Sequence, residues 1–307
     1  MLLVIYTFAT ATVAKGQQNW QLELNDAQAF VAAGDKLHAF AQYQRLAKQE
    51  NGLAQFTLAW FIKTGWLEGQ QDPVTACSWF LRSAQHMIPI GLQETGHCYR
   101  DELLPSKKPA QTAIHYYVEA QKNGVFAAAC DALVVEIRML KLQKPTQLAA
   151  CEQAAAQNAL LAQEILVDLY ADKNALNNNN QALYWLQQAA PKSAKSAYQF
   201  ALTLQASDAI PTEDVRYWFE ASASLGFEPA YLDTATLYYQ GISDDMPMDI
   251  ASVYQAKAYM WSKAWLESKD AQQQVPTLVN QIIATTPQSW QLELSEKVKK
   301  HLAQFPR

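Results

Sequence analysis

The chain has 307 residues, of which 50% are hydrophobic and 17% are charged, and its formal net charge is −5. Such a composition can bury an adequate core, whereas the acidic balance argues against a nucleic-acid-binding protein, which needs a basic surface. No stretch rich in Gly, Ser or Pro divides the middle of the chain, so its length need not mean two domains.

Residues 1–14 form an apolar leader, MLLVIYTFATATVA. The leader is too short to span a bilayer as a helix, which takes about 20 residues. Ala9-Thr10-Ala11 fits the small-residue pattern before a signal-peptide cleavage site, and Ala14 offers a second site, although no Lys or Arg precedes Lys15. We therefore predict a signal peptide over 1–14 and an exported, periplasmic protein. The alternative is a buried N-terminal segment of a cytoplasmic protein.

An aromatic residue returns at nearly regular spacing along the middle of the chain. Successive members lie 36, 37, 69, 33 and 43 residues apart, at Tyr43, Trp79, Tyr116, Trp185, Trp218 and Trp261. An Ala often lies three residues before the aromatic and a small residue four after it, offsets that share one helix face. Periods of this length indicate helical repeats. The doubled step predicts one degenerate repeat near 127–157.

A second helical pattern precedes each aromatic helix. In this pattern small or aliphatic residues recur at fixed packing positions, and one copy has Ala54, Leu58 and Ala59 there. Gly65 and Gly241 follow two copies at the same position, which suits a left-handed cap at the end of the helix. Each repeat is therefore predicted to be helix, loop, helix, turn.

This layout resembles the Sel1-like repeat family, a branch of the tetratricopeptide-type α-solenoids. The matching segments are AQFTLAWFIKTGWLEGQQDPVTACSWFLRSA and PAYLDTATLYYQGISDDMPMDIASVYQAKAYMWSKA, and the resemblance runs roughly from Asp26 to Leu266. It implies an all-α fold, a right-handed α-solenoid of about six to seven helix-turn-helix repeats, which we expect to occupy residues 20–285. The chain departs from the family pattern in having only 10 glycines.

Residues 286–307 are predicted to form a C-terminal capping helix. Pro287 suits the first helical turn, where its missing N–H is not needed. Lys297, Lys299 and Lys300 lie toward the C-terminal half, where positive charge complements the helix dipole. A polar terminal helix is what a solenoid requires to remain soluble.

The resemblance also bears on the four cysteines. Exported members of the family can join neighbouring helices by disulfides, which implies a Cys77–Cys98 bond between adjacent repeats and a Cys130–Cys151 bond within the degenerate repeat. An even number of cysteines in an exported chain is consistent with two disulfides. The residues themselves leave two alternatives open, namely a different pairing or four buried thiols that act as small apolar side chains.

No motif of a catalytic centre is present. The sequence lacks Cys-x-x-Cys, His-Glu-x-x-His, Gly-x-Gly-x-x-Gly and Gly-x-Ser-x-Gly. The adjacent pair His97-Cys98 has no second cluster with metal-ligand spacing. We therefore expect no enzyme activity, no cofactor and no bound metal.

In solenoids of this kind the first helix of each pair lines the concave face, and residues between its packing positions point into the groove. The candidate partner-binding residues are Trp60, Lys63, Gln93, His97, Arg100, Glu164 and Asp168. This mixed polar and aromatic lining suits a protein or peptide partner. We predict an exported scaffold for protein–protein interactions in the bacterial cell envelope. The alternatives are a module that binds peptidoglycan or exopolysaccharide, and a cytosolic signalling adaptor if the leader is not a signal peptide.

Overall fold

The structure, a computed structural model, describes residues 20–67, 69, 71–207, 212–268 and 275–305, which fold into helices and connecting loops without a β-strand. Contacts divide the chain into two compact units, unit 1 (Met1–Gln157) and unit 2 (Asn158–Arg307). The predicted signal peptide over 1–14 lies outside the described residues.

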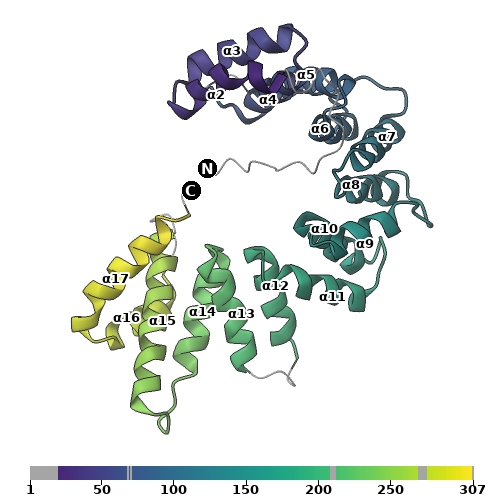
Figure 1. The fold of residues 1–307 in the computed structure, drawn as a ribbon. Coiled ribbons are helices and arrows are strands. Elements are labelled where there is room, and N and C mark those ends of the chain that lie inside the picture. The colour runs from purple at the N-terminus through teal and green to yellow at the C-terminus, as the bar shows by residue number, and fades with distance from the viewer. Residues whose placement is uncertain (1–19, 68, 70, 208–211, 269–274, 306–307) are drawn as a thin grey trace. The chain divides into compact units, whose positions relative to one another are not determined.

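In the described part of unit 1, helices follow one another with short connections (Figure 1). They are α2 (Asn25–Ala32), α3 (Lys36–Lys48), α4 (Gly52–Thr64), α5 (Pro73–Gln85), α6 (Pro89–Arg100), α7 (Pro109–Lys122), α8 (Ala128–Val134), the π-helix η1 (Val135–Met139) and α9 (Leu148–Ala156). Each helix packs against the next, and the repeats are the pairs α4/α5, α6/α7 and α8–η1/α9. We call the members of a pair its first and second helix.

The described part of unit 2 continues the same pattern (Figure 1). Its helices are α10 (Leu160–Ala171), α11 (Asn179–Ala189), α12 (Ala194–Gln205), α13 (Thr212–Ser224), α14 (Pro229–Gln240), α15 (Met248–Ser268), α16 (Thr277–Thr285) and α17 (Gln288–Leu302). The pairs are α10/α11, α12/α13 and α14/α15, and α17 then packs against α15. The predicted all-α solenoid of helix-turn-helix repeats is confirmed.

Small residues let neighbouring helices of the solenoid approach closely. The hydroxyl of Ser83 on α5 donates to the Gly52 carbonyl of α4 at 3.0 Å. A Cβ at Gly96 would lie 2.5 Å from Cε1 of Tyr117, whose side chain is fully buried. The periodic small residues are therefore packing contacts, as the helical spacing predicted.

The helix ends agree with the sequence in part. Asn51 and Asp72 cap α4 and α5 with side-chain oxygens that accept backbone N–H groups of the first turn. Gly65 ends α4 with a φ of 63°, the predicted left-handed cap. The same prediction is wrong for Gly241, which ends α14 with a φ of −78°. A Cβ there would lie 3.2 Å from the Tyr254 ring, so this glycine permits a close side-chain approach.

Both cysteine pairs lie at disulfide distance. Cys77 on α5 joins Cys98 on α6, with Cα atoms 5.7 Å apart, and Cys130 on α8 joins Cys151 on α9, with Cα atoms 4.7 Å apart. The first disulfide links adjacent repeats, whereas the second closes the repeat around 127–157. In that repeat α8 has only 7 residues before it passes into the π-helix, and α9 has 9. This repeat lacks the periodic aromatic residue of the other repeats, and the disulfide joins its two helices instead.

Candidate functional site

The first helix α4 presents a large aromatic side chain to solvent. Trp60 is 43% exposed, and the ring of Phe56 stacks one turn away with its centroid at 6.5 Å. The ammonium of Lys63 lies 5.3 Å from the Trp60 ring centroid, within the range of a cation–π contact. We call Phe56, Trp60 and Lys63 the Trp60 face.

An ion network connects this face to the first helices of the next two repeats. Lys63 Nζ lies 2.6 Å from Oε2 of Glu94 on α6, and that same oxygen lies 3.6 Å from Nδ1 of His97. His97 Nε2 lies 3.4 Å from Oδ1 of Asp131 on α8. Gln93 donates from Nε2 to Oδ2 of Asp131 at 2.7 Å. We call Lys63, Gln93, Glu94, His97 and Asp131 the first-helix network.

Opposite charges hold His97 in its protonated form. Burial alone would lower the pKa of His97, but hydrogen bonds and attraction from Asp131 and Glu94 outweigh burial and raise that pKa from 6.5 to about 9. Burial likewise tends to raise the pKa of Glu94, but its bonds with His97 and Lys63 bring the pKa below its usual value. At neutral pH the network thus pairs two cations with two carboxylates.

The network leaves little room for a ligand. The hollow beside Lys63, Glu94 and His97 has a volume of about 50 Å³ and reaches the disulfide of Cys77 and Cys98. Typical small-molecule sites have volumes of roughly 300–1,000 Å³. The network therefore orients Lys63 and holds the first helices together. The exposed side chain of Trp60 is the part of the site that a partner can reach.

The structure brings together four of the seven candidate residues, Trp60, Lys63, Gln93 and His97. Gln93 differs from the expectation, because it is only 6% exposed and therefore lies beneath the surface, where it holds Asp131. Arg100 lies one turn beyond His97, and its Nε and Nη2 atoms bind the carboxylate of neighbouring Asp101 at 2.7 and 3.0 Å.

The two remaining candidates belong to unit 2. Glu164 on α10 accepts hydrogen bonds from Ser193 at 2.6 Å and Ser196 at 3.3 Å, which tie it to the start of α12. Asp168 lies exposed one turn further along α10. The hydrogen bonds of Glu164 therefore join two consecutive first helices within unit 2.

Glu94 and Asp131 complete the first-helix network and are not among the candidates predicted from the sequence. Both stand on first helices, and 37 residues, about one repeat, separate them. Glu94 also precedes His97 by three residues, which places both on one helix face. The available signal was a pair of carboxylates on first helices one repeat apart, one of them on the same helix face as a histidine, since buried charge requires a partner.

Metal and membrane sites are absent from what the structure describes. Within residues 20–67, 69, 71–207, 212–268 and 275–305, no group of three or more His, Cys, Asp or Glu side chains is placed to hold a metal ion. None of the described helices combines the length and the apolar character that a membrane span requires.

Comparison with known proteins identifies the architecture. No protein-family model matches the chain. No curated protein matches its sequence either. Among solved structures, a protective antigen present in uropathogenic Escherichia coli strains and displaying an SLR fold is 16% identical with a TM-score of 0.57, and the match covers 94% of this chain and 61% of the antigen. A Sel1 repeat protein from Oxalobacter formigenes is also 16% identical with a TM-score of 0.57, and the match covers 76% of this chain and 98% of that protein. At this identity the matches show a shared fold.

Proposed function

We propose that this chain, which has the fold of Sel1-like repeat proteins, is a scaffold that binds a protein or peptide partner through the Trp60 face. Repeat solenoids bury their cores between neighbouring repeats and offer extended surfaces for recognition. The observation that carries the proposal is the exposed indole of Trp60 beside Lys63, which the carboxylate of Glu94 holds in place.

The geometry of the Trp60 face suits an interface centre. Tryptophan is enriched among the residues that dominate binding energy, because its large ring is desolvated on contact. Lys63 is anchored by Glu94 at 2.6 Å and also lies 5.8 Å from the Phe80 ring centroid, so its position is largely fixed before a partner arrives. A preorganised contact loses less side-chain entropy on binding.

The test is quantitative affinity purification from the cells that make the protein, with wild type, W60A and F126A compared. Phe126 is 57% exposed in the turn between α7 and α8, so F126A is a matched loss of an exposed aromatic side chain. Proteins that bind through the Trp60 face should be depleted with W60A and retained with F126A. If W60A recovers the same proteins in the same amounts as wild type, the proposed face is wrong.

We also propose that the scaffold is exported and acts in the bacterial cell envelope. The two disulfides support an oxidising compartment, since cytosolic thiols are usually kept reduced. Intact mass of the protein from its native cells, alkylated with and without prior reduction, tests this proposal. A mass lacking the leader and thiols that react only after reduction are expected. A full-length chain with four reactive thiols would instead indicate a cytosolic adaptor.

One observation favours glycan binding as a second candidate function. Tyr184 on α11 and Tyr217 on α13 are 49% and 63% exposed and lie one repeat apart. Each stands edge-on to the tryptophan that follows it, at 4.8 Å from Trp185 and 5.1 Å from Trp218. Exposed rings held in this way can stack on sugar rings. Binding of peptidoglycan fragments by wild type, and its loss in Y184A and Y217A, would support this function.

A further inference from the structure

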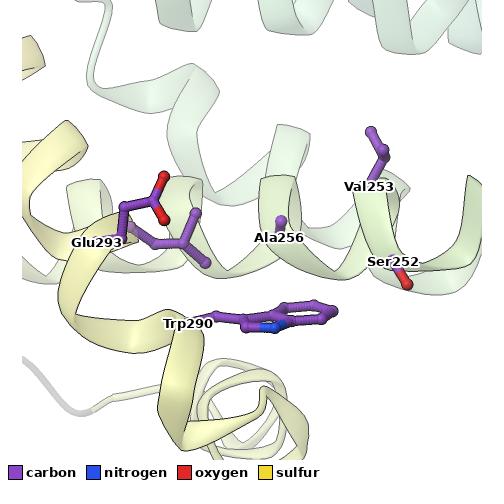
Figure 2. Close-up of a pocket in the computed structure, with 6 residues that line it drawn as sticks. Ser252, Val253, Ala256, Trp290 and Glu293 are labelled. Carbon is purple, nitrogen blue, oxygen red and sulfur yellow. The ribbon is translucent and has the colours of Figure 1, made fainter. Parts of the chain in front are cut away.

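Helices α15 and α17 of unit 2 border an open groove outside the Trp60 face. The groove has a volume of about 270 Å³ and is lined by Ser252, Val253 and Ala256 on α15 and by Trp290, Glu293 and Leu294 on α17. Figure 2 shows the indole of Trp290 lying alongside α15 near Ala256 and Ser252, with Glu293 further along α17. We call these six residues the α15/α17 groove.

The walls of the groove are held in place by contacts behind it. Tyr259 on α15 and Ser295 on α17 share a hydrogen bond of 3.2 Å. Gln255 donates from Nε2 to Oγ1 of Thr286 at 2.7 Å, which ties α15 to the segment between α16 and α17. Leu294 is only 7% exposed, so the floor is part of the core. The groove is therefore a preformed feature of the packed helices.

The lining is mostly apolar, with the carboxylate of Glu293 in it and that of Asp249 beside it. Val253 is 52% exposed although it is aliphatic. Asp249 is exposed one helical turn before Val253, on the same side of α15. The side chain of Glu293 is 75% exposed and has Lys297 at 2.8 Å on its own helix. An apolar groove between acidic side chains complements an apolar group flanked by cations.

We propose that the α15/α17 groove binds a cationic amphipathic helix of a protein partner, with one bulky apolar side chain seated between Val253 and Trp290. The volume lies just below the roughly 300–1,000 Å³ of small-molecule sites, which suits a single anchoring side chain. Lysine or arginine about one turn to either side of the anchor meets Asp249 and Glu293, and a cation also gains from the face of the Trp290 indole. This inference rests on the proposed scaffold function and defines a second contact for it.

The test uses a labelled peptide of about 18 residues, long enough to form a helix in isolation, with Leu at helical spacing and Lys elsewhere. One comparison peptide carries Glu in place of Lys, and another has the same residues in scrambled order. Fluorescence anisotropy at about 150 mM salt measures binding to the full chain, so that weak long-range attraction is screened. Wild type should bind the cationic helix more tightly than either comparison peptide.

Matched variants locate the contact. V253K and E293K should weaken binding about tenfold or more, because both place a cation against the cationic peptide. L292K and E296K should stay within about twofold of wild type. Leu292 is 77% exposed on α17 outside the groove, and Glu296 pairs with Lys299 much as Glu293 pairs with Lys297. Far-UV circular dichroism checks that all four variants fold.

Three results with the peptides and groove variants would overturn the groove proposal, and a fourth comes from W60A. The first three are equal binding of the acidic or scrambled peptide, equal losses in the control variants, and no binding by wild type. W60A separates this inference from the function on which it rests, because it should leave peptide binding unchanged. If W60A abolishes binding while V253K does not, the peptide binds at the Trp60 face, so the scaffold function stands and the groove proposal fails.

Discussion

His97 and Asp131 face each other from the first helices of consecutive repeats, with Nε2 and Oδ1 3.4 Å apart. The imidazole also has Glu94 at 3.6 Å on its other nitrogen, so one side chain joins two carboxylates. The side chains of Glu94 and Asp131 are only 11% and 10% exposed. Each carboxylate therefore depends on its hydrogen-bond and ion-pair partners, and His97 is the residue that they share.

Replacing His97 by Ala should destabilise unit 1. The substitution removes a positive partner from two largely buried carboxylates, and breaking such a pair destabilises a fold by about 2–4 kcal/mol. The apparent free energy of unfolding from urea titration, followed by tryptophan fluorescence, measures the loss. His38 supplies the control, because it also pairs with a carboxylate but is 70% exposed. H38A should leave stability unchanged, and equal losses in the two variants would contradict the role of burial.

The same residue predicts how stability depends on pH. A folded-state pKa raised to about 9 means that the charge of His97 contributes its full stabilisation below about pH 6.5. That contribution is lost as the pH rises through about 9. The thermal midpoint of wild type should therefore fall between pH 6.5 and pH 9 by more than that of H97Q. Parallel pH profiles would show that the ion pairs with His97 do not stabilise the fold.

The two disulfides provide an internally matched comparison. Each closes a loop with a sequence separation of 21, so the chain-entropy contribution is about 3 kcal/mol for both. The double variant C130S/C151S should nevertheless lose more stability than C77S/C98S, because the second helix of its repeat has only 9 residues and carries no aromatic side chain. Urea titration of both variants measures the difference. Equal losses would show that packing already holds the helices of that repeat together.

Adding a side chain at Gly96 should cause a steric clash between α6 and α7. A Cβ at this position would overlap the ring of Tyr117, which is fully buried and has little freedom to move. G96A should therefore destabilise the chain by about 1–3 kcal/mol. In a double-mutant cycle with Y117L, the loss from G96A should shrink, because the smaller side chain makes room. If the two losses simply add, the close contact is not the cause.

The sequence predicts the helices well because their signals are local. The spacing of Ala113, Tyr116 and Ala120 identifies a packing face within one helix, and both alanines are buried in α7, although the fully buried aromatic is Tyr117 and Tyr116 is half-buried. Gly65 was predicted correctly because its cap depends on its own backbone conformation. The prediction failed at Gly241, where contact with the Tyr254 ring decides the role of the glycine. Local patterns contain no information about such a contact.

The site was harder to predict for the same reason. Lys63 and Glu94 are 31 residues apart and meet only because consecutive first helices stack. The direction of Gln93 depends on how α6 is rotated against α8, which helical periodicity alone does not determine. The α15/α17 groove likewise requires Trp290 to lie against α15. Residue types at helical spacing suggest which side chains matter, whereas packing between repeats decides which of them remain accessible.

The most direct test of the scaffold function is site-specific photo-crosslinking in the cells that naturally make the protein. A photoreactive phenylalanine analogue replaces Trp60 in one variant and Leu292 in a control, since Leu292 is 77% exposed outside both proposed surfaces. A covalent adduct with one or a few defined proteins is expected from position 60, and none of these from position 292. No adduct from position 60, or the same adducts from both positions, would contradict a partner-binding role for the Trp60 face.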